Sequence, residues 1–199
     1  LTFNLMEGLK LSLFGAYTYN IVENSQYLPT SVWANGQAYK GTKKRESLLG
    51  NMMLTYKKNW KKHFFDVLAL AELQKETYTG YYTTVSNFST DKFGYNNLQA
   101  GALRLWEGTN SYYEQPRLAS FMGRFNYTYA DRYVLTLNAR TDASSKFGAN
   151  HKWGFFPSAS AAWVISEEEF MKQFPVIDNL KFRIGYGLAG NQSGIDSYT

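Results

Sequence analysis

Apolar and polar residues alternate along several long stretches of this chain. In the stretch 9–20, odd positions hold leucines and then tyrosines, whereas even positions such as Lys10, Ser12 and Asn20 are mostly polar. Successive side chains of a β-strand point to opposite faces, so this pattern predicts strands with one apolar and one polar face. The pattern, blurred only in the third stretch, predicts about seven strands: 9–20, 47–57, 64–78, 119–129, 133–140, 158–165 and 180–188.

Most of these stretches are long for strands of a soluble protein. A soluble strand usually has about five or six residues, whereas a tilted strand that crosses a bilayer needs about 9–11. The sequence therefore predicts an all-β fold, an antiparallel transmembrane β-barrel of which this chain holds a part.

The connections between the predicted strands alternate between short and long. Short turns are expected near Asn59 and at residues 131–132. A third short connection, 166–178, is expected to hold a helical turn with Ser166 as its cap and Glu169 completing a capping box. Long connections are expected at 21–46, 79–117 and 142–152. This alternation is typical of outer-membrane barrels, which have short periplasmic turns and long extracellular loops.

Aromatic residues gather at the ends of the predicted strands. Tyrosine and tryptophan are enriched where a membrane protein meets the two interfaces of the bilayer. At the short-turn ends they are Tyr56, Trp60, Tyr127, Tyr129, Tyr133 and Trp163. Tyr17 and Tyr19 lie at the long-connection end of the first strand. The alternative is that these aromatics are ordinary members of a β-sandwich.

The polar faces of the later strands carry six candidates for the lining of a barrel lumen: Arg124, Asn126, Asn138, Arg140, Lys181 and Arg183. In a β-sandwich these side chains would face bulk water, and in a barrel they would line a polar lumen or touch a plug. The opposite face carries small residues such as Gly123, Ala139 and Ala161 between aromatic ends. A lipid-facing surface tolerates such residues more easily than an interdigitated sandwich core does.

Composition narrows the function classes further. Aromatic residues make up 18% of the chain and charged residues 19%, and there is no cysteine. The net charge of +5 is scattered except for one cluster, Lys57, Lys58, Lys61 and Lys62, which we interpret as a solvated turn. A nucleic-acid partner would need a continuous basic stripe, so none is expected. The chain starts at Leu1 without a signal peptide, and we expect it to be a piece of a longer protein.

Residues for catalysis or metal binding are sparse. His63 and His151 are the two histidines and lie on different connections, and without cysteine a zinc or catalytic constellation is not expected. The glycines of 185–190 resemble a dinucleotide motif loosely, but no predicted helix follows them. We therefore expect a protein that is not an enzyme and has no cofactor.

Four motifs in the second half of the chain resemble a known family. They are Phe125-Asn126-Tyr127-Thr128-Tyr129-Ala130-Asp131-Arg132-Tyr133-Val134-Leu135-Thr136, Arg140-Thr141-Asp142-Ala143-Ser144-Ser145-Lys146-Phe147-Gly148 with Trp153-Gly154-Phe155-Phe156-Pro157-Ser158, Trp163-Val164-Ile165-Ser166-Glu167-Glu168, and Leu180 to Gly187 followed by Gly190-Asn191-Gln192. In this order they resemble the SusC/RagA-type TonB-linked outer-membrane proteins of Bacteroidetes. Ala143 departs from the glycine expected in the second motif, which changes only the freedom of that loop.

The resemblance implies a closed barrel of about 22 strands with a plug domain, of which this chain would hold roughly a third. It implies location in the bacterial outer membrane, import of oligosaccharides or peptides, and two partners: a SusD-type surface lipoprotein and the TonB complex. Residues 1–199 would then be barrel surrounded by membrane lipid, with no plug domain.

Clustered aromatics in the long connection 79–117 are the candidates for contact with a ligand. Trp106, Tyr112 and Tyr113 could stack on a sugar or peptide, or could instead be girdle or lid-packing residues. Two other functions stay open at this point: a soluble carbohydrate-binding β-sandwich and an outer-membrane adhesin barrel that transports nothing.

Overall fold

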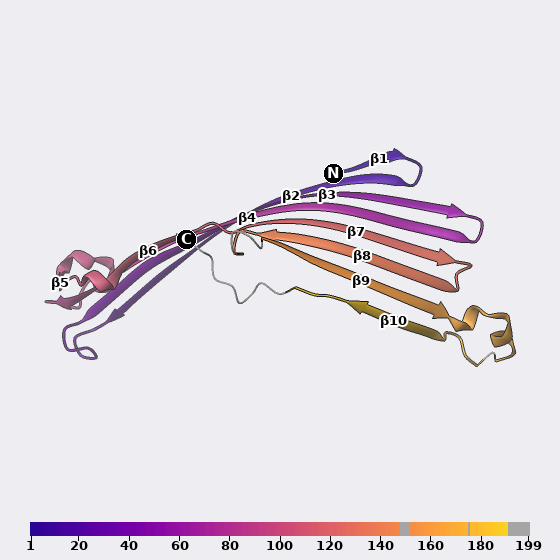
Figure 1. Ribbon diagram of the computed structural model, residues 1–199. Helices are drawn as coiled ribbons and strands as arrows, with labels where there is room; N and C mark the ends of the chain where they lie inside the picture. The colour runs from indigo at the N-terminus through magenta and orange to yellow at the C-terminus, as the bar shows by residue number, and fades with distance from the viewer. Residues whose placement is uncertain (148–151, 175, 191–199) are drawn as a thin grey trace. The chain divides into compact units, whose positions relative to one another are not determined.

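The protein folds as a single ten-stranded sheet. The computed structural model describes residues 1–147, 152–174 and 176–190. The strand order is β1-β2-β3-β4-β7-β8-β9-β10, with β5 and β6 each paired to β4 (Figure 1). Hydrogen-bonded pairs such as β7–β8 and β8–β9 are antiparallel. Within the described ranges no helix is both long enough and apolar enough to cross a membrane.

The strands are β1 Thr2–Met6, β2 Leu9–Leu28, β3 Gln37–Trp60, β4 His63–Phe88, β5 Gly101–Leu103, β6 Thr109–Glu114, β7 Arg117–Tyr129, β8 Tyr133–Ser144, β9 Trp153–Val164 and β10 Lys181–Gly187. Five short 3₁₀ helices join them: η1 Gly94–Asn96, η2 Leu98–Ala100, η3 Trp106–Gly108, η4 Ile165–Glu167 and η5 Glu169–Gln173. The seven predicted strands correspond to β2, β3, β4, β7, β8, β9 and β10. β1, β5 and β6 are additional.

Two of the three predicted long connections are largely strand. β2 continues to Leu28 and β3 begins at Gln37, so the connection expected at 21–46 is reduced to residues 29–36. β4 likewise continues to Phe88, well into the expected connection 79–117. At these strand ends polar and apolar residues are mixed on both faces, so they lack the regular apolar alternation that reveals a strand in sequence.

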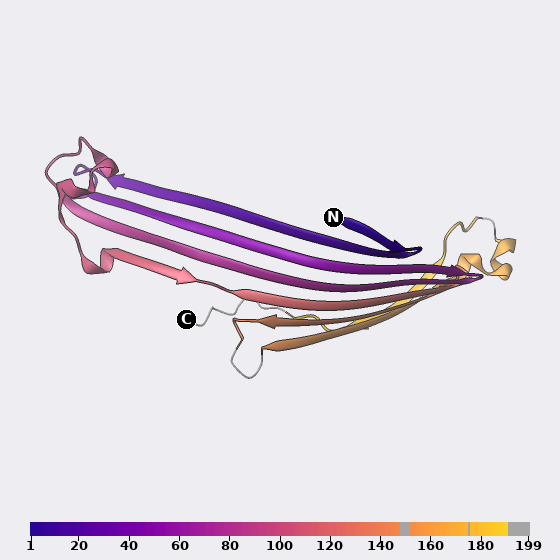
Figure 2. The same cartoon turned by 90° about the horizontal axis from the view of Figure 1, so that it is seen from above.

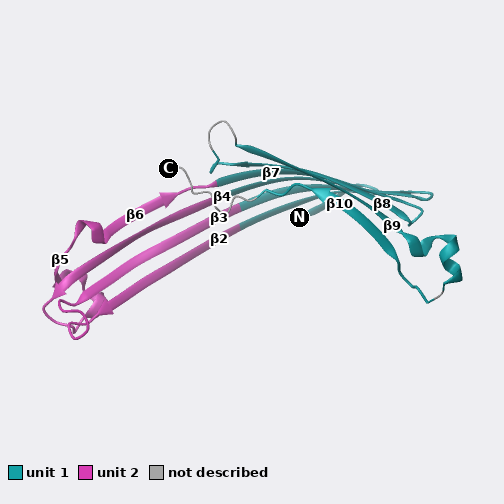
Figure 3. Cartoon of the chain, turned by 60° about the horizontal axis from the view of Figure 1, so that its bottom comes forward, with its two compact units in different colours: residues 1–16, 49–74, 117–198 teal, residues 17–48, 75–116, 199 magenta. Residues whose placement is uncertain are grey.

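The sheet divides into two compact units (Figure 3). The first comprises residues 1–16, 49–74 and 117–198, and the second comprises 17–48 and 75–116 with residue 199. By residue number, the strands β2, β3 and β4 each belong partly to one unit and partly to the other, and in Figure 2 each is one continuous ribbon.

The short turns of the first unit lie together at one end of its strands (Figure 1). The β3–β4 turn is at Lys61-Lys62 and the β7–β8 turn at 130–132, which confirms two of the predicted short turns. Ala130 and Asp131 have φ of 52° and 57°, as a type I′ hairpin turn requires. In the turn before β2, Gly8 has φ of 79°, and a Cβ there would collide with the carbonyl oxygen of Lys57.

The third short connection differs in detail from the prediction. It forms the 3₁₀ helices η4 and η5 rather than one capped helical turn, and no side chain caps either helix. Ser166 lies inside η4, and Glu169 is the first residue of η5, so the expected capping box is wrong. Glu168 instead ties this connection to the sheet: it accepts bonds from Arg132 Nη1 at 2.9 Å, the Tyr133 hydroxyl at 2.7 Å and Trp163 Nε1 at 3.0 Å.

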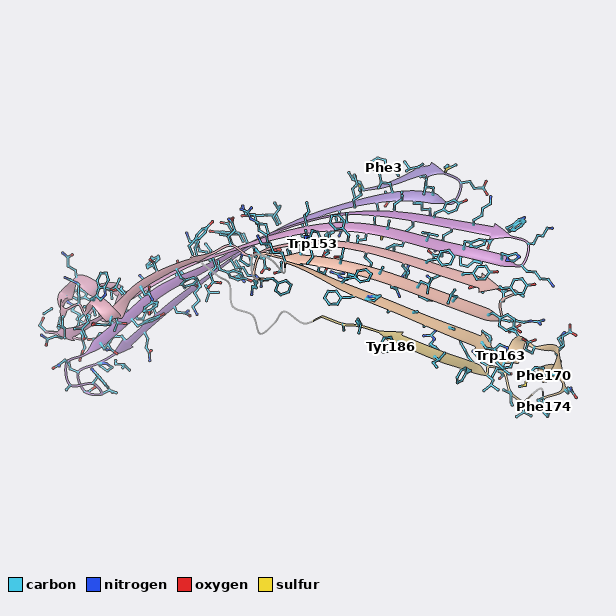
Figure 4. All side chains as sticks on the ribbon, in the orientation of Figure 1. Phe3, Trp153, Trp163, Phe170, Phe174 and Tyr186 are labelled. Carbon is cyan, nitrogen blue, oxygen red and sulfur yellow. The ribbon has the colours of Figure 1, made fainter. Side chains whose placement is uncertain are left out.

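The apolar face of the first unit consists of rows of side chains that cross its strands and include many exposed ones. Phe125 pairs with Leu137, which pairs with Ala159; Tyr129 pairs with Tyr133, which pairs with Trp163. Leu137 is 43% exposed and Ile184 of β10 64% exposed. In the described part of the first unit there is no second layer over this face. Figure 4 shows Trp163 at the turn end of β9 and Tyr186 on β10.

The second unit has a small core of its own. Ala38 of β3 and Val85 and Phe88 of β4 are buried there. The partly buried Tyr27, Leu98 and Ala100 pack against them. This core joins the ends of β2 and β3 to the segment with η1 and η2, so the tip of the second unit is an ordered structure.

Candidate functional site: a polar sheet face and an aromatic tip

The register places all six predicted lumen residues on one face of the first unit. Arg124 pairs with Asn138, and Asn126 pairs with Thr136. Arg140 pairs with Met122, two residues along the same face of β7. Arg183 pairs with Ala162 and Lys181 with Val164. Because Ala162 also pairs with Val134, the β10 residues share the face of the others.

Several of these polar side chains hold one another in place. Arg140 Nε donates to both carboxylate oxygens of Asp142 at 2.9 Å, and its Nη2 donates to the hydroxyl of Ser120 at 3.1 Å. Ser120 is only 1% exposed. Asn138 Nδ2 donates to the Ser158 hydroxyl at 3.1 Å on the next strand. The polar face is therefore a fixed hydrogen-bonded surface across β7, β8 and β9.

Two buried polar atoms on this unit lack a hydrogen bond to any described residue. They are Arg124 Nε and Asp66 Oδ1. The other oxygen of Asp66 lies 3.6 Å from Lys57 Nζ. Buried polar atoms normally have partners, and neither of these two atoms is open to solvent.

The three predicted ligand-contact residues do not form one platform. Trp106 begins η3 and is 88% exposed. Tyr112 and Tyr113 are neighbours on β6 and so point to opposite faces. The Tyr112 ring covers Gly80, where a Cβ would lie 2.7 Å from the ring. The Tyr113 hydroxyl accepts a bond from Gln115 Nε2 at 2.8 Å.

Two further tyrosines, which were not among the predicted ligand-contact residues, lie on the same face of the sheet as Tyr112. The Tyr39 and Tyr82 rings stack with centroids 6.0 Å apart. Tyr82 lies two residues from Gly80 and therefore on the face that Tyr112 covers. Further along this face Arg45 Nη2 donates to Glu76 Oε1 at 2.6 Å. The Arg45 guanidinium lies 5.5 Å from the centre of the Tyr78 ring. The alternation of aromatic residues and glycine at 78–82 was the available signal.

A carboxylate clasp orders the tip of the second unit. Asp91 accepts bonds from the Tyr27 hydroxyl at 2.6 Å, the Thr30 amide at 3.1 Å and the Thr30 hydroxyl at 2.8 Å. The bond to Asp91 raises the pKa of Tyr27 to about 12, with smaller contributions from burial and from the charge of Asp91. The bonds from Tyr27 and Thr30 lower the pKa of Asp91. The clasp therefore ties the β2–β3 connection to the segment after β4.

The described residues hold no group of three or more His, Asp or Glu side chains that could bind a metal. His63 stacks on Trp60 and shares a hydrogen bond of 2.8 Å with the Tyr127 hydroxyl, so it belongs to the aromatic row at the short turns. His151 lies outside the described residues, as do Gly148, Asn191 and Gln192 of the family motifs.

A single-layer antiparallel sheet with one exposed apolar face and one hydrogen-bonded polar face defines a class: the wall of a membrane β-barrel. The model of the family described as TonB dependent receptor-like, beta-barrel matches residues 1–199. The chain belongs to this family.

Two curated proteins are similar to this chain in sequence. The chain is 31% identical to TonB-dependent receptor P3 of Formosa agariphila over 195 residues, covering 96% of this chain and 19% of that protein. It is 30% identical to TonB-dependent receptor SusC of Bacteroides thetaiotaomicron over 218 residues, covering 98% of this chain and 19% of that protein. The chain thus spans about a fifth of the length of these relatives.

Solved structures share the fold. The RagAB peptide transporter matches with a TM-score of 0.82 at 20% identity, covering 94% of this chain and 21% of that one. The RagAB peptide importer in its closed-closed state matches with a TM-score of 0.85, also at 20% identity, covering 99% of this chain and 22% of that one. The partial-barrel fold is confirmed, and the soluble β-sandwich is not favoured.

Proposed function

We propose that this chain is part of the barrel wall of an outer-membrane importer that takes up oligosaccharides or peptides. The observation that carries the proposal is the pair of faces in the first unit, apolar and exposed on one side, polar and hydrogen-bonded on the other. Membership of the TonB-dependent receptor family supports transport over adhesion.

The two faces of the first unit would have different roles. The apolar face, with the rows of Leu137 and Tyr133, would contact lipid, and the polar face with Arg124, Asn138 and Arg140 would line the lumen.

The second unit would then stand outside the bilayer. β2, β3 and β4 have 20, 24 and 26 residues, and only about 9–11 residues are needed to cross a bilayer. Its tip exposes Trp106 and carries the face of Tyr39, Tyr82 and Tyr112. We propose that this face contacts substrate and that Trp106 and Tyr113 contact either substrate or a SusD-type lipoprotein lid.

Energy for import would come from the TonB complex, as the names of the relatives suggest. The test is uptake in a strain that lacks the full-length gene. Cells restored with the wild-type gene should take up fluorescently labelled oligosaccharides or peptides from a mixed pool, and deletion cells should not. Restoration with Tyr39→Ala and Tyr82→Ala together should lower uptake at limiting substrate, whereas Phe170→Ala, at the opposite end of the chain's strands, should not.

An outcome in which deletion leaves uptake of every labelled pool unchanged would refute import. Loss of cell adhesion in the same strain would instead support the non-transporting barrel.

A further inference from the structure

The turn between β3 and β4 carries an excess of positive charge that the proposed import function does not use. Lys57, Lys58, Lys61 and Lys62 lie within six residues and are all exposed. Among the described residues, the one ion pair of this turn is the 3.6 Å contact of Lys57 with Asp66. Acidic residues of the neighbouring turns, Glu7 and Asp131, offset only part of the charge. Residues 57–62 are called the basic turn below.

The basic turn lies at the edge of the apolar face. Met52 and Leu54 of β3 line a shallow apolar depression of about 410 Å³ together with Phe121. Alternation along β3 puts Lys58 and Trp60 on that same face, just beyond Tyr56. Lys58 therefore projects from the level where the apolar surface ends, so that its aliphatic stem can follow apolar atoms while its ammonium stays in water.

Trp60 fixes the position of the basic turn against the sheet. Its ring is 60% exposed and stacks on His63 with centroids 5.4 Å apart at 26°. The Lys61 ammonium lies 5.9 Å from the centre of the Trp60 ring. Tryptophan prefers the level of lipid headgroups, so the lysines beside it lie where headgroup phosphates would be.

We propose that the basic turn binds the phosphate groups of anionic glycerophospholipids in the inner leaflet of the membrane. The proposal rests on the membrane-barrel assignment of the previous section. Lysine is a compact cation with rotatable donors and binds phosphate as a point charge. Clusters of lysine next to a membrane-spanning segment attract anionic headgroups, and salt screens the attraction. Lys58, Lys61 and Lys62 provide the attraction, and Trp60 sets the depth.

The test uses the full-length protein in bilayers of phosphatidylcholine that contain a small fraction of photoreactive lipid. The reactive group is carried near the headgroup of either phosphatidylglycerol or phosphatidylcholine. Mass spectrometry of chymotryptic peptides then locates the label. We expect the basic turn to be labelled by phosphatidylglycerol in preference to phosphatidylcholine, and the preference to fall at high salt.

Substitution of Lys58, Lys61 and Lys62 by Gln should lower the phosphatidylglycerol label on this turn at least about tenfold. The matched control places Gln at Lys40, Lys43 and Lys44, three exposed lysines at the other end of β3, and should leave the label unchanged. Equal labelling by the two lipids, or a label that survives the triple substitution, would overturn the proposal and leave an acidic protein as the better partner. A parallel reaction uses phosphatidylcholine with the reactive group on its acyl chain, and absence of its label from the apolar face around Phe121 would refute the barrel assignment instead.

Discussion

Asp91 shows how one residue can order a surface loop. Its carboxylate holds Tyr27 and Thr30 from a connection more than 60 residues earlier in the sequence. Because Tyr27 has a raised pKa, its bond to Asp91 is fully present below the ordinary tyrosine pKa and is lost as pH rises through about 12. Because the pKa of Asp91 is lowered, the clasp is lost in acid only at a pH below the range in which carboxylates ordinarily become protonated.

This clasp gives a spectroscopic prediction. The difference between the tyrosinate absorbance titrations of the wild type and of Tyr27→Phe isolates one hydroxyl, which should ionise near pH 12. In the Asp91→Asn background, the corresponding difference between titrations with and without Tyr27→Phe should give a midpoint nearer the ordinary tyrosine pKa of about 10. The reason is that the carboxylate that stabilises the protonated hydroxyl is gone. A wild-type midpoint near 10 would show that the clasp does not form.

Glu168 has the corresponding role at the short-turn end. It accepts bonds from Arg132 in the β7–β8 turn, Tyr133 of β8 and Trp163 of β9, and its side chain is 12% exposed. Glu168→Ala leaves those three donors unpaired, so we expect amide hydrogen exchange in residues 165–173 to accelerate at least about tenfold. Glu169→Ala, one residue along, serves as the matched control. Equal protection in the two variants would contradict the role assigned to Glu168.

At the scale of the strand, the sequence predicts the strands in which one face is apolar. It does not predict the strand segments in which neither face is apolar. The predicted strand 119–129 covers nearly all of β7, and the predicted strand 133–140 covers β8 except its last four residues, because rows such as Phe125–Leu137 alternate with Arg124–Asn138. The outer halves of β2, β3 and β4 were assigned to loops, since polar residues there occupy both faces. Their strand state depends on backbone pairing with neighbours, which leaves no hydrophobic period in the sequence.

The candidate site was predictable to a different degree. Alternation alone placed Arg124, Asn138 and Arg140 on one face. It gave no access to contacts made across strands, such as the Tyr39–Tyr82 stack or the Arg45–Glu76 pair, because register is a property of the folded sheet.

Neighbouring residues of β8 provide a test of the two faces. Leu137→Arg puts a charge on the face assigned to lipid and should cost about 2–4 kcal/mol of folding free energy near the bilayer midplane. Asn138→Arg puts the same charge on the polar face and should cost far less. Urea unfolding of the full-length protein in lipid vesicles, followed by tryptophan fluorescence, measures both. Similar costs for the two variants would remove the distinction between the faces.

At the scale of the whole molecule, the two units combine a membrane wall with an ordered tip. The wall is held by interstrand pairing and by the polar network around Arg140 and Ser120, and it leaves its apolar side chains outside. The tip has its own small core around Val85 and the Asp91 clasp. A membrane wall and an ordered tip are both expected of an importer that binds substrate before moving it.

The central claim is that the odd and even residues of β8 face different solvents. The chain has no cysteine, so single cysteines at positions 133 to 140 of the full-length protein can each carry a nitroxide label in a lipid bilayer, with any cysteine elsewhere replaced. Electron paramagnetic resonance then measures collisions with oxygen, which enters lipid, and with a water-soluble nickel chelate. We predict that oxygen accessibility peaks at the odd positions, whereas nickel accessibility is higher at the even ones. The contrary result is that both reagents peak at the same positions, or that nickel reaches every position equally; either would mean that this sheet is not a membrane wall.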